Sequence, residues 1–273
     1  MHPPLACTVR GCGRPLTPAG RHLSCDRGHS FDLARSGYIS LLQPQDRRSS
    51  EPGDAKGAVA ARARLLGAGI GRAAIDAIAA LAPATSGTLV AADLGCGSGE
   101  LLGTLASGRD VCGVGIDLSS AAASMAARRF PALTWVVANA DRRLPLLDAS
   151  VHAVLSLNGR RNPVECARVL VTGGALIIAL PAPDDLIELR AFLHGSGVAR
   201  DRADAAVAAH APHFALVDRI AVRERHSLGV ERLRDLLRGT YRGARLSAAA
   251  RVETLDSLDV TLSTDVLALQ RLS

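Results

Sequence analysis

The sequence predicts an α/β fold in which a doubly wound, mostly parallel sheet follows a small N-terminal module rich in cysteine. Three observations lead to this prediction. The apolar, strand-like run that begins at Leu89 and ends in Asp93 leads into a glycine-rich turn and then into a helical pattern. Apolar runs and helical patterns then alternate along the chain, as they do in open parallel sheets. Finally, three of the six cysteines lie between Cys7 and Cys25.

Length and composition limit the classes of protein that fit. The 273 residues have room for one large domain and a small module, and 48% of them are hydrophobic. No run of 18 uninterrupted apolar residues occurs, and the N-terminus lacks the pattern of a signal peptide. We therefore expect no membrane association and a cytoplasmic location.

The chain is basic, and almost all of its positive charge comes from arginine. The net charge is +6, and Lys56 is the single lysine among 32 basic residues. Arginine binds phosphate through two parallel hydrogen bonds, so a polyanionic partner is one interpretation. A genome of high GC content, which favours arginine and alanine codons, is the other interpretation, and composition alone leaves both open.

The N-terminal cysteines have the spacing of a structural zinc site. Cys7, Cys12, Cys25 and His29 follow the pattern C-x4-C-x12-C-x3-H. Two pairs of soft ligands, each pair on a turn, can meet at one tetrahedral Zn²⁺ ion. The alternatives are three unrelated buried cysteines with a surface histidine, or His22 as the fourth ligand. About 30 residues bury little core, so metal binding would supply much of the module's folding free energy.

The same module is positively charged. Seven arginines stand against three aspartates in residues 1–48, which leaves +4. A basic zinc module is a candidate for binding a phosphate backbone, although runs of charge are usually solvated faces. The candidate RNA contacts in this module are Arg10, Arg14, Arg27, Arg47 and Arg48.

We expect three segments along the chain: a zinc-binding module at residues 1–42, a linker and leading helix at 43–69, and the main domain at 70–273. The linker prediction comes from the polar, proline- and glycine-containing stretch Gln43–Lys56. Asp54 is a candidate cap for the helix that follows.

The main domain is predicted to contain seven strands separated by helices. A helix at Ile70–Leu81 precedes the sheet, a second is expected at Val164–Leu170, and Gly173-Gly174 should form a tight turn. Between the last two strands we expect helices at Val230–Arg238 and Ser247–Thr254. The expected strands are Thr88–Asp93, Val111–Asp117, Leu133–Val137, Val151–Leu157, Ala175–Leu180, Phe214–Arg225 and Leu258–Leu269.

The glycine-rich turn carries the chemistry of a ligand cradle. Asp93 precedes Gly95, Gly97 and Gly99, and each glycine removes a Cβ that would block the turn or the approach of a ligand. The spacing differs from the G-x-G-x-x-G dinucleotide fingerprint. The form (D/E)-x-G-x-G-x-G resembles motif I of class I S-adenosylmethionine (AdoMet) methyltransferases, which implies AdoMet as cofactor.

Two further stretches are candidates for cofactor binding. Asp117 ends the next strand, 24 residues after Asp93, where open α/β sheets place the carboxylate that accepts hydrogen bonds from ribose. The alternative role for Asp117 is the N-cap of the following helix, for which Ser119 is the other candidate. The remaining predicted cofactor contacts are Leu118 beside this acid and the residues Asn139, Ala140 and Asp141, which resemble the loop that contacts adenine in these enzymes. Asp141 is equally typical of an ordinary turn.

The loop after the fourth strand lies at the carboxyl edge of the predicted sheet, beside the transferable methyl group. Asn158 is the candidate for positioning the acceptor base through its amide, and a turn or cap asparagine is the alternative. Arg160 and Arg161 follow it as candidate RNA contacts, and Arg142 and Arg143 in the preceding loop could hold displaced backbone.

Several stretches together resemble one family. They are the zinc quartet, H-S-F-D-L-A-R-S-G-Y-I-S-L-L (29–42), R-R-S-S-E-P-G-D (47–54) and A-R-A-R-L-L-G-A-G (61–69). The chain is similar to the 23S rRNA guanine-N1 methyltransferases of the RlmA/TlrB type. This resemblance implies a structural zinc module on a class I methyltransferase core, a Rossmann-like, seven-stranded, mostly parallel sheet whose last strand is antiparallel. The gap of four residues in the first ligand pair departs from the family, where two are common.

The resemblance also implies a function. The expected reaction is methyl transfer from AdoMet to N1 of a guanosine in hairpin 35 of 23S rRNA, at position 748, with resistance to tylosin-type macrolides. Housekeeping methylation at position 745 is the alternative within the family. The core motifs alone fit a small-molecule methyltransferase equally well, and a non-enzymatic zinc-dependent RNA-binding protein is a third interpretation. The sequence leaves the general base open, and it leaves a homodimer open.

Overall fold

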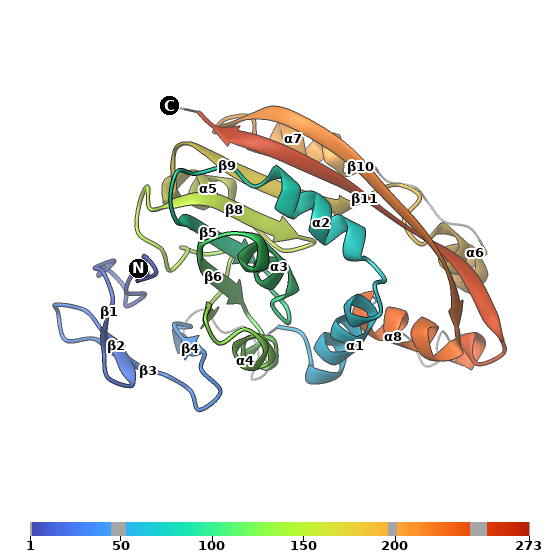
Figure 1. Ribbon diagram of the computed structural model, residues 1–273, viewed down its shortest axis with the longest axis horizontal. Helices are drawn as coiled ribbons and strands as arrows, with labels where there is room; N and C mark the ends of the chain where they lie inside the picture. Colours follow the sequence, from blue (N-terminus) through green and yellow to red (C-terminus); the bar gives the residue numbers. More distant parts are fainter. Residues whose placement is uncertain (1, 45–52, 196–200, 241–249, 273) are drawn as a thin grey trace.

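The computed structural model describes residues 2–44, 53–195, 201–240 and 250–272 (Figure 1). Two sheets form its framework. The strands of the small N-terminal sheet are β1 (Thr17–Ala19), β2 (His22–Ser24) and β3 (Ser30–Asp32). The strands of the large sheet are β4 (Ile39–Ser40), β5 (Leu89–Leu94), β6 (Val111–Asp117), β7 (Thr134–Val137), β8 (Val151–Leu157), β9 (Leu170–Pro181), β10 (Phe214–Gly229) and β11 (Ser257–Arg271).

The large sheet has the order β10-β11-β9-β8-β5-β6-β7-β4. Strands β4 to β9 pair in parallel, whereas β11 is antiparallel to both β9 and β10. The order reverses at β5, and open α/β sheets bind ligands at the carboxyl ends of the strands beside such a switch point. The predicted class I methyltransferase fold is thereby confirmed.

The described part of the chain contains the helices α1 to α8 and a helical turn at residues 250–252. The helices of the main domain cover both faces of the sheet (Figure 1). The eight helices are α1 (Lys56–Gly67), α2 (Arg72–Leu81), α3 (Glu100–Gly108), α4 (Ser120–Arg129), α5 (Pro163–Val169), α6 (Ile187–His194), α7 (Ala203–His210) and α8 (Val230–Thr240). No helix among the described residues is long and apolar enough to cross a membrane.

Side chains that alternate along the strands build a separate core on each face. In β5, Val90 and Ala92 belong to one apolar cluster and Leu89 and Ala91 to another, because successive residues of a strand point to opposite faces. Helices α2, α3 and α4 cover one face. Helices α5 and α7 cover the other face together with the N-terminal module, which contributes the buried Leu5.

The sheet is one strand wider than the seven strands predicted for the core. The additional strand is β4, whose residues Ile39 and Ser40 pair in parallel with Val136 and Val137 of β7. The backbone N–H of Leu41 then donates to the carbonyl of Val137 at 2.9 Å. A strand of two residues has no periodic pattern, so sequence alone gave no signal for it. The end of the N-terminal module is thus part of the core sheet.

Two local predictions need correction, and a third is only partly covered by the described residues. Gly173-Gly174 does not form a tight turn but lies within β9, where Gly173 has φ +73° and the pairing with β8 shifts register. Asp54 does not cap α1, because the N-cap of this helix is Ala55, which forms no side-chain hydrogen bond. The carboxylate of Asp54 pairs with Arg62 at 2.5 Å instead. The predicted helix Ser247–Thr254 is partly described: residues 250–252 are helical and residues 253–254 form a turn, whereas residues 247–249 lie outside the described residues.

A third apolar cluster joins the helices α1, α6 and α8. It packs them against the C-terminal end of β10 and the N-terminal end of β11, and α1 and α8 lie side by side in Figure 1. The side chain of Arg64 on α1 donates to Asp235 on α8 at 2.9 Å, which lowers the pKa of that carboxyl. This cluster fixes the helix that follows the linker.

Candidate active site and metal centre

The glycine turn after β5 is built from three left-handed residues. Gly95, Gly97 and Gly99 have φ values of +78°, +55° and +89°. A Cβ on Gly95 would lie 3.1 Å from the Cα of Gly159, and one on Gly99 would lie 2.6 Å from Trp135. A Cβ on Gly97 would meet nothing within 4 Å. The outer glycines are therefore required by packing, while the middle glycine faces open space that a ligand can enter.

Asp117 holds this turn from the end of β6. One carboxylate oxygen accepts the N–H of Gly97 at 3.0 Å, and the other accepts the N–H of Ser119 at 2.8 Å. Ser119, rather than Asp117, caps α4, because its hydroxyl accepts the N–H of Ala122. Burial raises the pKa of Asp117, and the two N–H donors act in the opposite direction.

Asp93 lies beneath the turn and is 2% exposed. Burial raises the pKa of its carboxyl to about 8, and the charges of Asp117 and Glu100 add to that shift. The carboxyl is therefore largely protonated at neutral pH, and a cation bound beside it would favour the ionised form. A cationic cofactor suits such a site.

The loop after β8 is locked against the glycine turn. Asn158 has φ +57°, a left-handed conformation that asparagine tolerates better than most residues, and its N–H donates to the carbonyl of Ala179 at 3.0 Å. A Cβ on Gly159 would overlap the carbonyl oxygen of Leu94. The Asn-Gly pair thus brings Asn158 directly beside the cradle, and Gly159 is a packing requirement that was not predicted from the sequence.

The loop after β7 brings two predicted functional residues together. Asn139 accepts the N–H of Asp141 through its side chain at 3.0 Å, which forms an Asx turn with Ala140 between them. Asp141 accepts a hydrogen bond from Arg160 at 3.0 Å. Asp141, which was predicted to contact adenine, therefore has one carboxylate oxygen hydrogen-bonded to Arg160, which was predicted to contact RNA.

The end of the linker lies on the predicted cofactor loop. A Cβ on Gly53, which has φ +85°, would lie 2.5 Å from the backbone nitrogen of Ser119. The hydroxyl of Ser119 also donates to the carbonyl of Asp54 at 2.6 Å. From the sequence, the P-G-D stretch was predicted to be a linker whose Asp54 caps the next helix. The structure shows that its glycine permits close approach of backbone to the segment Leu118–Ser119.

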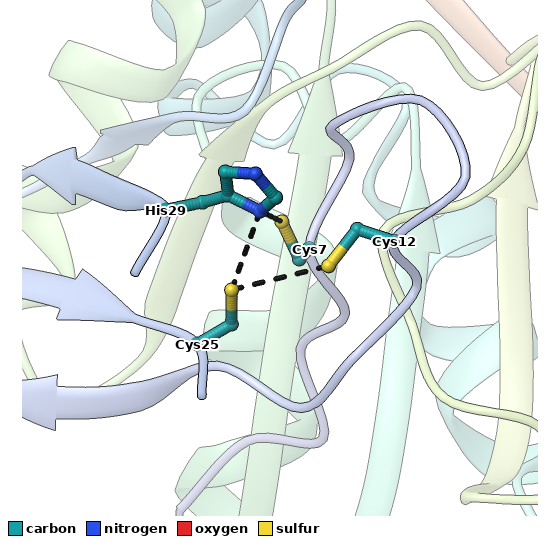
Figure 2. A group of neighbouring side chains, drawn as sticks. All are labelled: Cys7, Cys12, Cys25 and His29. Atoms are coloured by element: carbon teal, nitrogen blue, oxygen red, sulfur yellow. Dashed lines mark hydrogen bonds between the residues drawn. The ribbon is translucent and has the colours of Figure 1, made fainter. Parts of the chain in front are cut away.

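The four predicted zinc ligands come together in the N-terminal module (Figure 2). Their ligand atoms all lie within 4.8 Å of one another. The Nδ1 atom of His29 lies 3.4 Å from the sulfurs of Cys7 and Cys25, and the sulfurs of Cys12 and Cys25 are 3.9 Å apart. A tetrahedral Zn²⁺ ion with Zn–S bonds of about 2.3 Å needs ligand separations of roughly 3.5–3.8 Å. The quartet therefore fits zinc.

Each ligand pair lies on its own turn. Gly13 donates to the carbonyl of Cys7 at 3.1 Å, and Gly28 donates to the carbonyl of Cys25 at 3.0 Å. Left-handed Gly11 and Gly13 let the wider spacing between Cys7 and Cys12 close on the metal position. Burial raises the pKa of Cys7 to about 12, so its thiolate needs a bound cation at neutral pH.

The predicted RNA contacts have different surroundings. Arg14 pairs with Asp26, and Arg27 donates to the carbonyl of Gly11 at 3.2 Å, so both brace the module. Arg10 is exposed and forms no ion pair with any described residue. Arg47 and Arg48 lie outside the described residues.

Arg160 and Arg161 differ although they are adjacent. The side chain of Arg160 is 75% exposed, whereas Arg161 is half-buried and donates to the carbonyl of Gly159 at 3.0 Å. Burial lowers the pKa of Arg161. The guanidinium of Arg161 is thus turned into its own loop, and it offers less to an RNA backbone than the sequence suggested.

Two family models match separate parts of the chain. Residues 6–50 match the zinc-ribbon family model described as "RlmA, N-terminal". Residues 91–174 match the model described as "Methyltransferase domain". The first match contains the Cys/His quartet, and the second contains the glycine turn and the loop of Asn158.

Relatives match over most of the chain. A 23S rRNA (guanine(748)-N(1))-methyltransferase of Streptomyces fradiae is 35% identical over 232 residues, which cover 83% of this chain and 78% of that protein. A putative 23S rRNA (guanine-N(1)-)-methyltransferase of Bacillus subtilis strain 168, YxjB, is 33% identical over 263 residues, 91% of each chain.

Solved structures share the core fold. A putative methyltransferase of Bacillus halodurans C-125 superposes with a TM-score of 0.52 and 14% identity, covering 72% of this chain and 97% of that one. The YcgJ protein of Bacillus subtilis gives a TM-score of 0.53 and 13% identity, covering 73% and 98%. At these identities the likeness shows the fold alone.

Proposed function

The chain belongs to the 23S rRNA (guanine-N1)-methyltransferase family, and we propose that it methylates N1 of a guanosine in hairpin 35 of 23S rRNA, at position 748. It is an AdoMet-dependent enzyme that carries a structural zinc ribbon. The observation that best supports the proposal is that one sheet joins both functional parts. Strand β4 extends the zinc module into the sheet whose carboxyl edge carries the glycine turn.

We assign cofactor binding to the residues around that edge. When bound, AdoMet supplies a methyl group already activated by its sulfonium. The backbone of the glycine turn offers the approach, Asp117 offers its remaining lone pairs to ribose, and Asp93 offers a negative charge once ionised. The complete set comprises Asp93, Gly95, Gly97, Gly99, Asp117, Leu118, Asn139, Ala140 and Asp141. Cys7, Cys12, Cys25 and His29 are assigned to zinc.

The acceptor chemistry needs alignment and loss of one proton. The methyl carbon forms a bond to N1 while its bond to sulfur breaks, and the N1 proton leaves to solvent or to a base. N1 lies on the Watson–Crick edge, so the target guanosine must be unpaired or displaced from its helix. We assign to Asn158 the positioning of that edge, because its loop is fixed against the cradle.

The target position rests on a relative. The Streptomyces fradiae protein is named for position 748 and matches 83% of this chain, which favours 748 over 745. We further propose resistance to tylosin-type macrolides and action in the cytoplasm, where 23S rRNA is made and assembled. A homodimer is a further expectation that analytical ultracentrifugation would test.

Methyl transfer from labelled AdoMet to a hairpin 35 transcript tests the proposal. Three transcripts are compared: the natural hairpin, one with adenosine at position 748 and one with adenosine at position 745. We expect label in the first and third only. Loss of label with the 745 change alone would assign the housekeeping position, and label confined to small molecules would overturn the RNA substrate.

Two substitutions separate the amide of Asn158 from its backbone. Asn158→Gly removes the amide but keeps the left-handed conformation, whereas Asn158→Ala removes the amide and strains the backbone by about 1 kcal/mol. We expect both variants to lose turnover by tenfold or more while AdoMet affinity changes little. Normal turnover in the glycine variant would remove the amide from the reaction.

A further inference from the structure

A pocket lies between the zinc module and the core, beside the proposed AdoMet site. Its volume is about 530 Å³, which is in the range of sites that bind small molecules. The backbone of residues 6–13 forms one wall and residues 138–145 form the opposite wall. Of the residues assigned above to the cofactor, Asn139 alone lines it, so most of the pocket is separate from the cradle.

The sheet topology places this pocket at the catalytic edge. Leu41 and Leu42 directly follow β4, and Ala138 and Asn139 directly follow β7, the parallel strand beside it. Both pairs therefore lie at the carboxyl ends of their strands, the same edge that carries the glycine turn after β5. Strands β5 and β7 are separated by β6, so at about 4.8 Å per strand the pocket begins roughly 10 Å from that turn.

The lining of the pocket combines an apolar floor with a cationic rim. The apolar lining includes Leu41 and Leu42, which are almost fully buried at 1% and 9% exposure, and Val9, which is half-buried and keeps accessible surface. The rim carries Arg10 from the zinc module and Arg142 and Arg143 from the core, and none of the described residues that line the pocket is acidic. Arg10 and Arg142 form no ion pair with any described residue, and Arg143 lies 3.8 Å from the exposed Asp148.

The two walls are held in place by specific contacts. The hydroxyl of Thr8 donates to the carbonyl of Leu41 at 2.7 Å, and Gln43 donates to Thr8 at 3.0 Å. A Cβ on Gly13 would lie 3.7 Å from the guanidinium of Arg143, so this arginine lies over the turn that carries Cys7 and Cys12. Cys7 and Cys12 also line the pocket, which makes its module wall dependent on the metal centre.

We propose that this pocket binds one unpaired nucleotide of the RNA, next to the target guanosine. Its phosphate contacts Arg10, Arg142 and Arg143, and its base packs on the accessible apolar surface of Val9. Guanidinium groups bind phosphate in a bidentate manner, and single-stranded bases stack or pack on apolar surfaces. This inference rests on the proposed function, since it assigns to the same RNA a second point of attachment that holds the strand while the neighbouring base enters the active site.

The test compares an Arg10→Gln, Arg142→Gln, Arg143→Gln triple variant with Arg238→Gln. Arg238 is exposed on α8, and this helix lies far from strands β1 to β3 of the zinc module in Figure 1. The full-length, zinc-loaded proteins are titrated with a fluorescent hairpin transcript in the presence of S-adenosylhomocysteine, at several salt concentrations. We expect at least tenfold weaker RNA binding for the triple variant, and a salt slope reduced by about 0.7 for each phosphate that is no longer neutralised. The Arg238 variant should change affinity less than twofold.

Steady-state kinetics and crosslinking complete the test. With the triple variant KM for RNA should rise while kcat at saturating RNA and the Kd for AdoMet stay within about twofold. A matching loss of AdoMet affinity would assign the pocket to the cofactor and overturn the proposal, as would unchanged RNA binding. Should the variant fail to retain zinc, crosslinking of 4-thiouridine RNA to the wild-type enzyme decides: crosslinks within residues 6–13 or 138–145 support the pocket, and crosslinks only elsewhere refute it. RNA that binds through the pocket but receives no methyl group would refute the proposed function alone.

Discussion

Replacing Asp93 with asparagine should abolish a proton release that accompanies AdoMet binding. In the free protein burial raises the pKa of this carboxyl to about 8, with Asp117 and Glu100 adding to the shift. A carboxyl with that pKa is about nine-tenths protonated at pH 7. Binding of a sulfonium cation beside it favours the ionised form, so the proton should leave on binding. The expected release approaches 0.9 proton per AdoMet at pH 7 and falls to roughly 0.1 at pH 9.

The same group makes folding stability depend on pH. Because its folded pKa lies above the unfolded value of 3.8, the folded protein holds a proton that the unfolded chain lacks between about pH 4 and pH 8. Stability of the ligand-free protein should therefore fall as pH rises through that window, by an amount on the order of 5 kcal/mol. The Asp93→Asn variant should show no such dependence from this position, since the amide stays neutral.

Calorimetric titration of AdoMet in buffers of different ionisation enthalpy measures the proton release directly. The wild-type enthalpy should vary with buffer at pH 7, and that of Asp93→Asn should not. Asp117→Asn should reduce the proton release only in part, because the charge of Asp117 adds to the raised pKa of Asp93 while burial remains the main cause. Equal proton release in wild type and Asp93→Asn would refute the assignment of the titrating group.

Three other substitutions test the metal centre and the packing of the site. Cys25→Ser should lose zinc and RNA binding yet retain AdoMet binding, as measured by metal analysis and calorimetry. Gly53→Ala forces a left-handed alanine against Ser119, a strain of about 1–2 kcal/mol before the steric clash, so Tm should fall by several degrees and AdoMet affinity by at least fivefold. Gly159→Ala overlaps the Leu94 carbonyl and should lose most turnover, and normal kinetics in that variant would contradict the packing described.

The sequence predicted the central strands well, because their signals are local. Strands β6 and β8 begin and end at the predicted residues, since both are nearly continuous apolar runs buried on both faces. Strand β10 extends to Gly229, four residues beyond the predicted Arg225. Its second half alternates exposed residues with half-buried ones, and most of the half-buried residues are polar. A prediction that relies on apolar residues therefore ends this strand too early.

The site shows the same contrast between local and distant signals. The glycine turn, the acid that ends β6 and the zinc quartet were predicted from spacing along the chain, and the structure joins Asp117 to the turn and brings the four zinc ligands together. The contact of Gly53 with Ser119 joins residues 66 positions apart, and the lock of Gly159 on Leu94 joins residues 65 positions apart. Neither contact has a local signature. The pocket at Arg10 and Arg142 likewise exists only after β4 has joined the sheet.

The segment between the zinc module and the core has a structural role at both of its described ends. At one end Ile39 and Ser40 pair with β7, and at the other Gly53 and Asp54 lie on the loop that begins α4. A passive tether would need neither a strand pairing nor a glycine in close contact with backbone. The module is therefore held in a fixed relation to the cradle, and Arg10 of the module lies along the same sheet edge as the glycine turn proposed to bind AdoMet. Such a fixed distance suits an enzyme that must grip an RNA at one point while it presents a single base at another.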